Sequence, residues 1–402
     1  MDLARLRQLL VPGPSGIEAL HTVEDFRRAA KRRLPKMIFE FVDGGADGEL
    51  AVNANRAALD NVLFDPAFLV DVADRDLSTN VFGTPVSYPL ILSPSGLATV
   101  VHPEGEAAVA RAAKDAGLIF GVSTGSGLSM EAIAEASDGG RLWFQLYLWK
   151  SEEVVRDLID RARSNGYEAL IVTVDVPVVG KRERDLRNGM SLPVRLRPSN
   201  MVDAAWRLGW IRDVLLGPDI TFGSLTGIAP GDDASSIGEY TSRELTDPRR
   251  TWDDLAMIRR QWEGPLLVKG VMTPADARAA VDHGADGIIV SNHGGRQISS
   301  VPGVAAVTPA IVDAVGDRAE VFLDGGVRRG EDIVKARALG ATAASGGRLW
   351  FWGLAAGGDA GVARVLSILE ADVDRTLALI GRRRYDDVGL DALHGHPDEG
   401  RR

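Results

Sequence analysis

From Pro89 onward, short apolar runs alternate along the chain with segments that have the period and length of helices. Each run has the length of a buried strand, and each following segment is long enough to connect two parallel strands. This alternation predicts an α/β fold, a (β/α)8 TIM barrel with right-handed crossover connections. The predicted strands are residues 90–93, 119–123, 142–146, 169–174, 266–269, 287–291, 321–323 and 341–345.

The last predicted strand and the choice of a barrel rest on further considerations. Residues 341–345 read Ala-Thr-Ala-Ala-Ser, which is poor in strand-forming residues. A doubly wound open sheet would have a similar alternation of strands and helices. Polar residues follow nearly all the predicted strands, however, and the mouth of a barrel explains this recurrence better than an open sheet does.

One stretch precedes the alternation of strands and helices, and another interrupts it. Residues 1–88 predict a helical lead-in, in which Thr22 and Asp25 have the spacing of a capping box. Residues 190–250 contain clusters of Pro, Gly, Asp and Ser and predict a long, partly mobile insertion over the barrel mouth after strand four. We therefore expect a single domain over residues 1–402, with the barrel at 89–381 and a C-terminal tail at 382–402.

Within the insertion, residues 204–216 predict one helix that carries Trp206, Trp210 and Val214 on a single face. Such a face can contact a membrane surface, a neighbouring subunit or the entrance of an active site. The segment carries few cations, which favours packing against protein. Weak peripheral association with a membrane through residues 204–216 is the alternative.

The composition excludes several classes of protein. The chain has 402 residues, no cysteine and a formal net charge of −10. Disulfides, thiolate catalysis and cysteine-ligated metal sites are therefore excluded, no metal site is expected, and nucleic acid is a poor partner. The N-terminus lacks the apolar region of a signal peptide, and no apolar run approaches the length that spans a membrane. We expect a cytoplasmic protein.

The sixth predicted strand leads into a polar, glycine-rich turn that contains His293 and Arg296. Side chains at the carboxyl end of a barrel strand face the mouth, where barrel enzymes have their active sites. We interpret His293 as a general base and Arg296 as a carboxylate-binding group; a structural histidine beside a surface arginine is the alternative. After strand four, Asp175 can orient His293, and Arg182 can supply a second cation unless its charged run is only a solvated face.

The last two strands lead into glycine-rich loops at residues 324–330 and 346–348, and each loop contains arginine. Loops at these two positions of a barrel commonly bind phosphate through backbone N–H groups. The chain has no Walker loop and no Rossmann fingerprint, so a phosphorylated cofactor is favoured and a phosphosugar substrate is the alternative. Lys269, after strand five, fits a Schiff base, an ion pair or a solvated side chain. After strand three, Gln145 can bond a heterocycle and Tyr147 a substrate oxygen.

Taken together and in this order, the motifs make the chain resemble the family of FMN-dependent α-hydroxy acid oxidases and dehydrogenases, which includes glycolate oxidase, lactate oxidase and mandelate dehydrogenase. The resemblance extends from Leu34 to about Gly381, and Ser-Asn-His-Gly-Gly-Arg-Gln at residues 291–297 is its most specific motif. The lead-in and residues 182–185 are most similar to mandelate dehydrogenase. Other matching motifs lie at residues 102–106, 144–147, 173–175, 267–270 and 324–330.

This resemblance implies an FMN cofactor and oxidation of an (S)-2-hydroxy acid to the 2-oxo acid, with flavin N5 as the acceptor. It also implies a homotetramer, and a final electron acceptor that is oxygen, a quinone or a carrier protein. His293 would take the substrate proton, Asp175 would stabilise the imidazolium, Arg296 and Arg182 would bind the carboxylate, and Tyr147 would bond the substrate. Implied FMN contacts are Pro94, Ser95, Gly96, Ser123, Gln145, Thr173, Lys269 near flavin N1, Ser291, Asp324, Gly325, Gly326, Arg328, Gly347 and Arg348.

Three positions depart from the family pattern. Phe41 stands where the family usually has a tyrosine that helps hold the substrate carboxylate, and losing such a hydrogen bond costs about 1 to 3 kcal/mol. Gly125 replaces a bulky aromatic residue of short-chain oxidases, which leaves space for a bulky or aryl substrate such as mandelate. Ile298-Ser299 replaces the usual Leu-Asp pair. The alternatives are therefore an unusual or non-hydroxy-acid substrate, a catalytically impaired binding protein, or a non-redox barrel that binds FMN or another phosphate.

Overall fold

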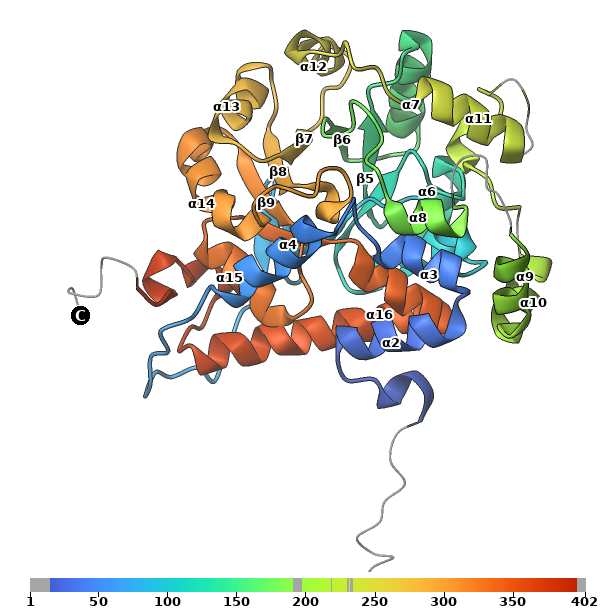
Figure 1. Ribbon diagram of the computed structural model, residues 1–402. Coiled ribbons are helices and arrows are strands. Elements are labelled where there is room, and N and C mark those ends of the chain that lie inside the picture. Colours follow the sequence, from blue (N-terminus) through green and yellow to red (C-terminus); the bar gives the residue numbers. More distant parts are fainter. Residues whose placement is uncertain (1–14, 191–196, 218, 230, 232–233, 396–402) are drawn as a thin grey trace, which may run out of the picture.

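The computed structural model describes residues 15–190, 197–217, 219–229, 231 and 234–395 (Figure 1). Eight parallel strands close into a barrel in the order β10-β3-β4-β5-β6-β7-β8-β9. The remaining parts of the predicted lead-in, insertion and tail lie outside the described residues. The barrel strands are β3 (Leu90–Leu92), β4 (Ile119–Ser123), β5 (Arg141–Tyr147), β6 (Ala169–Thr173), β7 (Leu266–Val271), β8 (Gly287–Ser291), β9 (Glu320–Asp324) and β10 (Ala343–Gly346).

The barrel and all eight predicted strands are confirmed, including the alanine-rich last one. β10 pairs in parallel with β9 on one side and with β3 on the other. Closure of the barrel gives this strand a hydrogen-bonding neighbour on each side, so tertiary context outweighs its weak strand propensity.

Apolar side chains fill the barrel and close its amino-terminal end. A short antiparallel hairpin of β1 (Thr79–Val81) and β2 (Thr84–Val86), which the sequence pattern did not indicate, covers that end. Its turn residue Phe82 packs against Trp143 and Phe322, with ring centroids 5.7 and 5.9 Å away. The opposite, carboxyl end of the strands is therefore the end at which a ligand can enter.

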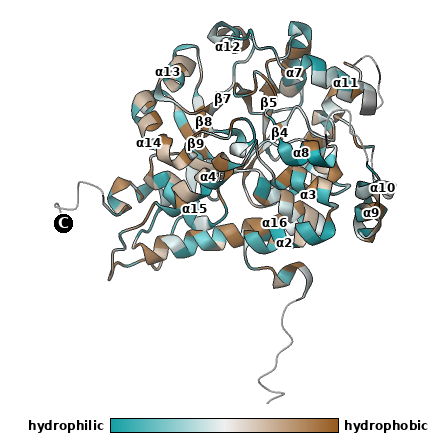
Figure 2. Cartoon of the chain, viewed as in Figure 1, coloured by the Kyte–Doolittle hydropathy of each residue, from teal (hydrophilic) through white to brown (hydrophobic). Residues whose placement is uncertain are grey.

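Helices surround the strands, and Figure 2 shows hydrophobic strands at the centre with hydrophilic residues over the outer helix faces. The last helix is bent where Gly357 and Gly358 leave helical geometry, and it packs along α2 (Val23–Arg33). The helices that follow the barrel strands are α5 (Gly105–Asp115), α6 (Met130–Ser137), α7 (Glu152–Ser164), α12 (Trp252–Arg259), α13 (Pro274–Asp282), α14 (Val304–Val315), α15 (Gly330–Ala338) and α16 (Arg348–Leu379).

The lead-in places helices beside the barrel mouth. The predicted capping box is present at the start of α2, where Asp25 N donates to Thr22 Oγ1 over 3.1 Å and Thr22 N donates to Asp25 Oδ2 over 3.0 Å. After a short 3-10 turn at Gly16–Ala19, the chain continues through α2, α3 (Lys36–Asp43) and α4 (Leu50–Asp60).

The described part of the insertion contains α9 (Pro198–Ala205), α10 (Leu208–Leu216) and α11 (Ala234–Glu244), and α8 (Glu183–Asn188) precedes it. The prediction of one helix over residues 204–216 is wrong, because the chain leaves helical geometry at Arg207. Trp206 is consequently 81% exposed, whereas Trp210 is turned inward and its Nε1 donates to Val100 O over 2.8 Å. The two tryptophans therefore do not share a face.

Candidate active site

A cavity of about 850 Å³ opens at the carboxyl end of the barrel strands. All the predicted substrate-binding residues line it, namely Phe41, Gly125, Tyr147, Arg182 and Arg296. Of the other predicted site residues, Pro94, Ser95, Gly96, Ser123, Lys269, His293, Asp324, Gly325, Gly326, Arg328, Gly347 and Arg348 also line it, whereas Asp175, Gln145, Thr173 and Ser291 lie behind the lining.

His293, which lines the cavity, forms a hydrogen-bonded pair with Asp175 behind it. The distance from His293 Nδ1 to Asp175 Oδ1 is 3.0 Å, and Asp175 Oδ2 is buried with no hydrogen-bond partner in the described structure. A carboxylate on Nδ1 favours the tautomer that carries its proton there, so Nε2 is left as an acceptor. Burial lowers the pKa of His293, with Lys269 and Arg182 acting in the same direction against Asp175. The imidazole is therefore uncharged at neutral pH, and its Nε2 can accept a proton.

The backbone conformation that presents His293 is unusual. Its φ is +58°, in the left-handed region, and its N–H donates to Ser291 Oγ over 3.0 Å. Side chains with a Cβ seldom adopt this region, and the following glycines Gly294 and Gly295 share it. The short turn His293–Gly295 thus departs from regular helical geometry, and the His293 side chain lines the cavity.

Arg182 and Arg296 place two positive charges beside this pair. Burial strongly lowers the pKa of Arg296, and the like charges of Arg182 and Arg348 lower it further. Arg296 donates from Nη1 to Phe41 O and Gly44 O over 2.8 and 2.9 Å, while its guanidinium lies 5.4 Å from the centroid of the Phe41 ring. Neighbouring buried cations are unfavourable without a counterion, so this end of the cavity is suited to an anion.

Lys269 and Asp324 form a buried ion pair beneath the cavity, with 2.9 Å between Nζ and Oδ2. Both side chains are less than a tenth exposed. Two serine hydroxyls complete the hydrogen bonding of this ion pair. Lys269 Nζ donates to Ser291 Oγ over 3.0 Å, and Asp324 accepts from Ser291 and from Ser93. A Schiff base at Lys269 is disfavoured, because the pKa of its ammonium is raised, Asp324 and Asp175 outweighing its desolvation.

Gln145 is held between two strand ends. Its Nε2 donates to Thr173 Oγ1 over 3.0 Å, and its Oε1 accepts from Ser123 Oγ over 3.1 Å. These bonds run across β4, β5 and β6 at one level of the barrel. They fix the orientation of the amide, which no sequence pattern could specify.

Arg328 and Arg348 form a second group of cations in the cavity lining. Gly325 and Gly326 have φ of +146° and +81°, which lets the backbone of the loop after β9 approach Asn55 closely. Arg328 lies over the Trp352 ring at 4.6 Å. Arg348 donates to backbone carbonyls, and its pKa is lowered to about 10 by burial and by the charge of Arg328. Two buried cations facing glycine-rich backbone are suited to a phosphate.

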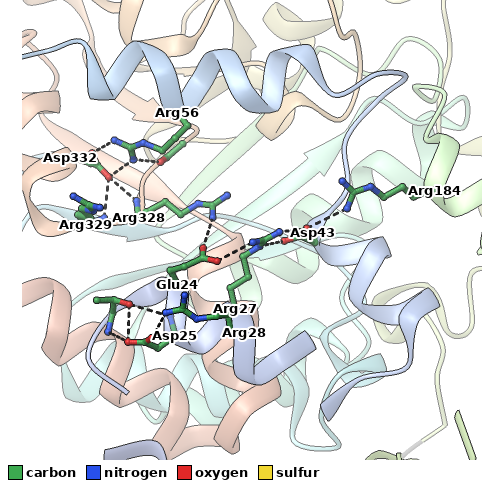
Figure 3. A network of polar contacts seen from close by, with 12 residues as sticks. Glu24, Asp25, Arg27, Arg28, Asp43, Arg56, Arg184, Arg328, Arg329 and Asp332 are labelled. Carbon is green, nitrogen blue, oxygen red and sulfur yellow. Dashed lines mark hydrogen bonds and ion pairs between the residues drawn. The ribbon is translucent and has the colours of Figure 1, made fainter. Parts of the chain in front are cut away.

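A network of ion pairs supports this second site (Figure 3). Glu24 contacts both Arg27 and Arg328, and Arg27 donates to Asp43 over 2.6 and 2.9 Å. Asp43 is also paired with Arg184, just beyond Arg182 in the sequence. The network thereby ties the lead-in to the loop that carries Arg328 and to α8.

Asp332 anchors the loop that carries Arg328. It is fully buried, binds Arg56 through both oxygens at 2.6 and 2.7 Å, and accepts from Arg328 N and Arg329 N. We expect Asp332→Asn to cost about 1.5 to 3 kcal/mol of stability, because it weakens charge-assisted hydrogen bonds. Urea denaturation measures this loss, and titration of apoprotein with FMN should show weaker binding as well.

The matched control for this variant is Asp60→Asn. Asp60 is the other carboxylate partner of Arg56, at 2.8 Å, but its side chain is 59% exposed. Exposed pairs contribute less than about 1 kcal/mol, so this variant should behave as the unaltered protein. Equal losses in the two variants would contradict the assigned role of Asp332.

Sequence reasoning missed several residues of the site. Asn55 and Arg56, both on α4, line the cavity, and Asn55 is buried and exchanges hydrogen bonds with Asn292. Asp185 on α8 and Phe222 from the insertion also line it. Phe222 occupies part of the space expected at Gly125, since a Cβ on Gly125 would lie 3.6 Å from its ring. Asn55 stands out only because it is a polar residue buried in the middle of α4. Its burial cannot be read from the sequence, so no sequence signal identified it.

In the parts of the chain that the structure describes, no helix combines the length and the apolar character that crossing a membrane requires.

The chain is similar to known proteins over nearly its whole length. The family model for FMN-dependent dehydrogenase matches residues 30–395. A putative L-lactate dehydrogenase of Mycobacterium tuberculosis is 42% identical over 94% of this chain and 91% of its own, and an L-lactate oxidase of Nostoc sp. is 40% identical over 92% and 97%. The crystal structure of the monotopic membrane protein (S)-mandelate dehydrogenase is 40% identical, with a TM-score of 0.88 over 93% of this chain and 99% of that one.

A cavity lined by His293, with Asp175 bonded to it, and by several arginines agrees with these matches. The chain belongs to the family of FMN-dependent dehydrogenases and is an FMN-dependent enzyme that oxidises 2-hydroxy acids.

Proposed function

We propose that the enzyme oxidises a bulky or aryl (S)-2-hydroxy acid, of which mandelate is the model, to the 2-oxo acid. One observation carries the proposal: Arg182, Arg296, Arg328 and Arg348 line one cavity together with His293, which is hydrogen-bonded to Asp175. Arg328 and Arg348 suit the phosphate of FMN, and Arg182 and Arg296 suit a substrate carboxylate.

The cavity residues suit FMN in charge and in hydrogen-bonding character. Glycine-rich loops and Arg328 would hold the phosphate, and the Ser123–Gln145–Thr173 hydrogen bonds would present polar groups to the ring system. Lys269 would lie near the part of the ring that becomes anionic, where a buried ammonium is favourable. Bound FMN supplies a two-electron acceptor at flavin N5.

The protein's own residues would perform the acid–base chemistry. His293 Nε2 would accept the proton of the substrate hydroxyl, and Asp175 would stabilise the resulting imidazolium through the 3.0 Å hydrogen bond. Arg182 and Arg296 would fix the carboxylate and so orient the substrate Cα. The Tyr147 hydroxyl, whose pKa is raised by burial, remains a hydrogen-bond donor to the substrate.

A bulky substrate is favoured by the apolar wall of the cavity, which includes Leu186, Met190, Phe222 and Leu245. The structural similarity to (S)-mandelate dehydrogenase supports the same choice, whereas the relatives named for lactate support a small acid. The test is an anaerobic visible spectrum of the purified holoenzyme with (S)-mandelate, lactate, glycolate and longer 2-hydroxy acids in turn. Faster bleaching of the flavin band by mandelate than by lactate is expected, and the reverse order would overturn the aryl assignment.

The electron acceptor and the assembly are further parts of the proposal. Rapid reoxidation on admitting air would identify an oxidase, and slow reoxidation a dehydrogenase that uses a quinone or a carrier protein. The homotetramer implied by the resemblance predicts a particle of four chains in light scattering.

We also propose peripheral association with a membrane through an apolar edge of α9 and α10, formed by Met201, Val202, Trp206 and Leu208. Each of these side chains is 63 to 81% exposed, and the two helices lie at the periphery of the molecule (Figure 1). The mandelate dehydrogenase to which the chain is similar is described as a monotopic membrane protein. Exposed apolar side chains on a surface helix are suited to the lipid interface.

Replacing Trp206 and Leu208 by serine should lower partitioning to anionic phospholipid vesicles by about 10-fold or more, because two apolar side chains no longer leave water. Co-sedimentation with the vesicles measures this. Leu379→Ser is the control, since Leu379 is 65% exposed on the distant helix α16. Binding that is equally weak in all three proteins would contradict the proposal.

A further inference from the structure

Asp185 is a buried acid for which the structure supplies no partner. It lies on α8, is 7% exposed and lines the same cavity as Arg182 and Arg296. Within the described residues, no hydrogen bond or ion pair reaches its carboxyl group. Buried polar groups are almost always hydrogen-bonded. A carboxyl group left open toward a substrate cavity is therefore positioned for a partner that arrives with the substrate.

The charged groups around Asp185 come from three elements. Arg182 and Arg184 belong to the start of α8, Arg296 to the turn after β8, and Glu40 to α3. Burial raises the pKa of Asp185 to about 6, because desolvation and Glu40 outweigh the three arginines. An anion that enters the cavity beside it would raise the pKa further, since two neighbouring negative charges repel each other.

The ionised and neutral forms of Asp185 have opposite effects on a carboxylate ligand. The ionised form repels it and competes for the arginines, whereas the neutral acid has an O–H group to donate. From the α3 side, Phe41 presents its backbone carbonyl and its aromatic ring to Arg296, and its side chain has no hydrogen-bond donor. A neutral Asp185 would thus supply a hydrogen-bond donor beside Arg182 and Arg296, where the Phe41 ring has none.

We propose that Asp185 binds the carboxylate of the 2-hydroxy acid as a neutral carboxylic acid, taking one proton from solvent as the anion enters and returning it when the 2-oxo acid leaves. The inference rests on the proposed function, because it requires the carboxylate to lie at the Arg182–Arg296 end. Asp185 is then a substrate-binding residue that is protonated when the substrate site is occupied and ionised when it is empty.

The test is isothermal titration of the holoenzyme with phenylglyoxylate and with oxalate, in buffers that differ in ionisation enthalpy. Net uptake approaching one proton per site is expected at pH 7. The association constant should fall by up to about tenfold per pH unit above pH 6. Asp185→Asn keeps a donor without a titratable proton, so the uptake should disappear. Asp185→Ala should also bind about tenfold more weakly than Asp185→Asn.

The matched control is Glu183→Gln, which removes a negative charge from the same helix. Glu183 does not itself line the cavity, and its partners Lys181 and Arg187 remain in the variant, so proton uptake should remain. Infrared difference spectra of the unaltered holoenzyme provide a second readout, because a new carboxylic acid band should appear when phenylglyoxylate binds. Asp185→Glu should shift that band.

The outcomes are distinguishable. Binding without proton uptake, or uptake that persists in Asp185→Asn and so belongs to another group such as His293, would overturn the role of Asp185 alone. Failure of both probes to bind a flavin-loaded enzyme would overturn the proposed carboxylate site itself, and the inference with it. If the Asn and Ala variants lose FMN, absence of the infrared band in the unaltered enzyme would overturn the inference.

Discussion

Replacing His293 by glutamine is expected to lower the rate of flavin reduction by the substrate about 100- to 10,000-fold. Glutamine has a similar size and can still form hydrogen bonds, but it cannot accept a proton at neutral pH, and a positioned general base contributes a factor of this order. Anaerobic stopped-flow spectroscopy at saturating substrate measures the rate directly. The affinity for FMN should be nearly unchanged, because the variant retains Arg328 and Arg348, the arginines proposed to hold the phosphate.

The control is His102→Gln. His102 is also largely buried, but it is paired with Glu104 at 3.7 Å and does not line the cavity. Its flavin reduction rate should stay within about twofold of the unaltered enzyme, as expected for a residue remote from the chemistry. A His293→Gln enzyme that reduces flavin at an undiminished rate would contradict the role of His293 as the base.

Replacing Lys269 by methionine should cost about 3 to 5 kcal/mol of unfolding free energy, because it leaves the buried Asp324 carboxylate without its cation. Ser291 and Ser93 would remain as partners of Asp324, but hydroxyls do not neutralise its charge. The change in the urea denaturation midpoint of the apoprotein, followed by circular dichroism, measures the loss. Reduced flavin should also be bound less tightly by the variant.

The loss should depend on pH in a defined direction. In the unaltered protein, burial raises the pKa of Asp324, but Lys269 and the hydrogen bonds from Ser93 and Ser291 lower it by a larger amount, so the net shift is downward. The ionised pair therefore stabilises the fold at pH values above about 4, the pKa of an unfolded aspartate. This stabilisation is lost as the pH falls through the lower pKa of the folded state. Without Lys269, burial should raise that pKa and the acid becomes neutral on mild acidification. The difference between the two proteins should therefore shrink as the pH falls from 7 toward 4.

Lys335→Met is the control for this variant. Lys335 is equally buried, but it donates to Leu59 O, and its acidic neighbour Glu331 is 37% exposed. Its removal leaves no buried carboxylate unpaired, so a smaller loss with little dependence on pH is expected. A pH-independent loss in Lys269→Met would indicate that packing, rather than the charge of Asp324, determines the effect.

The barrel and the strand-end chemistry could be predicted because both depend on local sequence. Buried strands are apolar runs, and their carboxyl ends converge at one mouth, so the sequence alone assigns His293, Arg296 and Lys269 to one site. The capping box at Thr22 is likewise a local pattern.

The parts that could not be predicted depend on tertiary contacts. The break between α9 and α10 accompanies bonds from Arg207 to Arg32 O and from Trp210 to Val100 O, both formed with distant segments. Asn55 and Arg56 enter the site from the lead-in only because α4 packs beside the turn that carries His293. Helical periodicity contains no information about such partners.

The left-handed backbone at His293 sets stability against activity at a single position. A residue with a Cβ held in that conformation costs of order 1 kcal/mol or more, a penalty that glycine escapes and asparagine reduces. Selection for thermal stability alone would therefore favour glycine or asparagine at residue 293, and either one removes the base proposed above. On the proposed function, histidine at this position lowers stability in exchange for turnover.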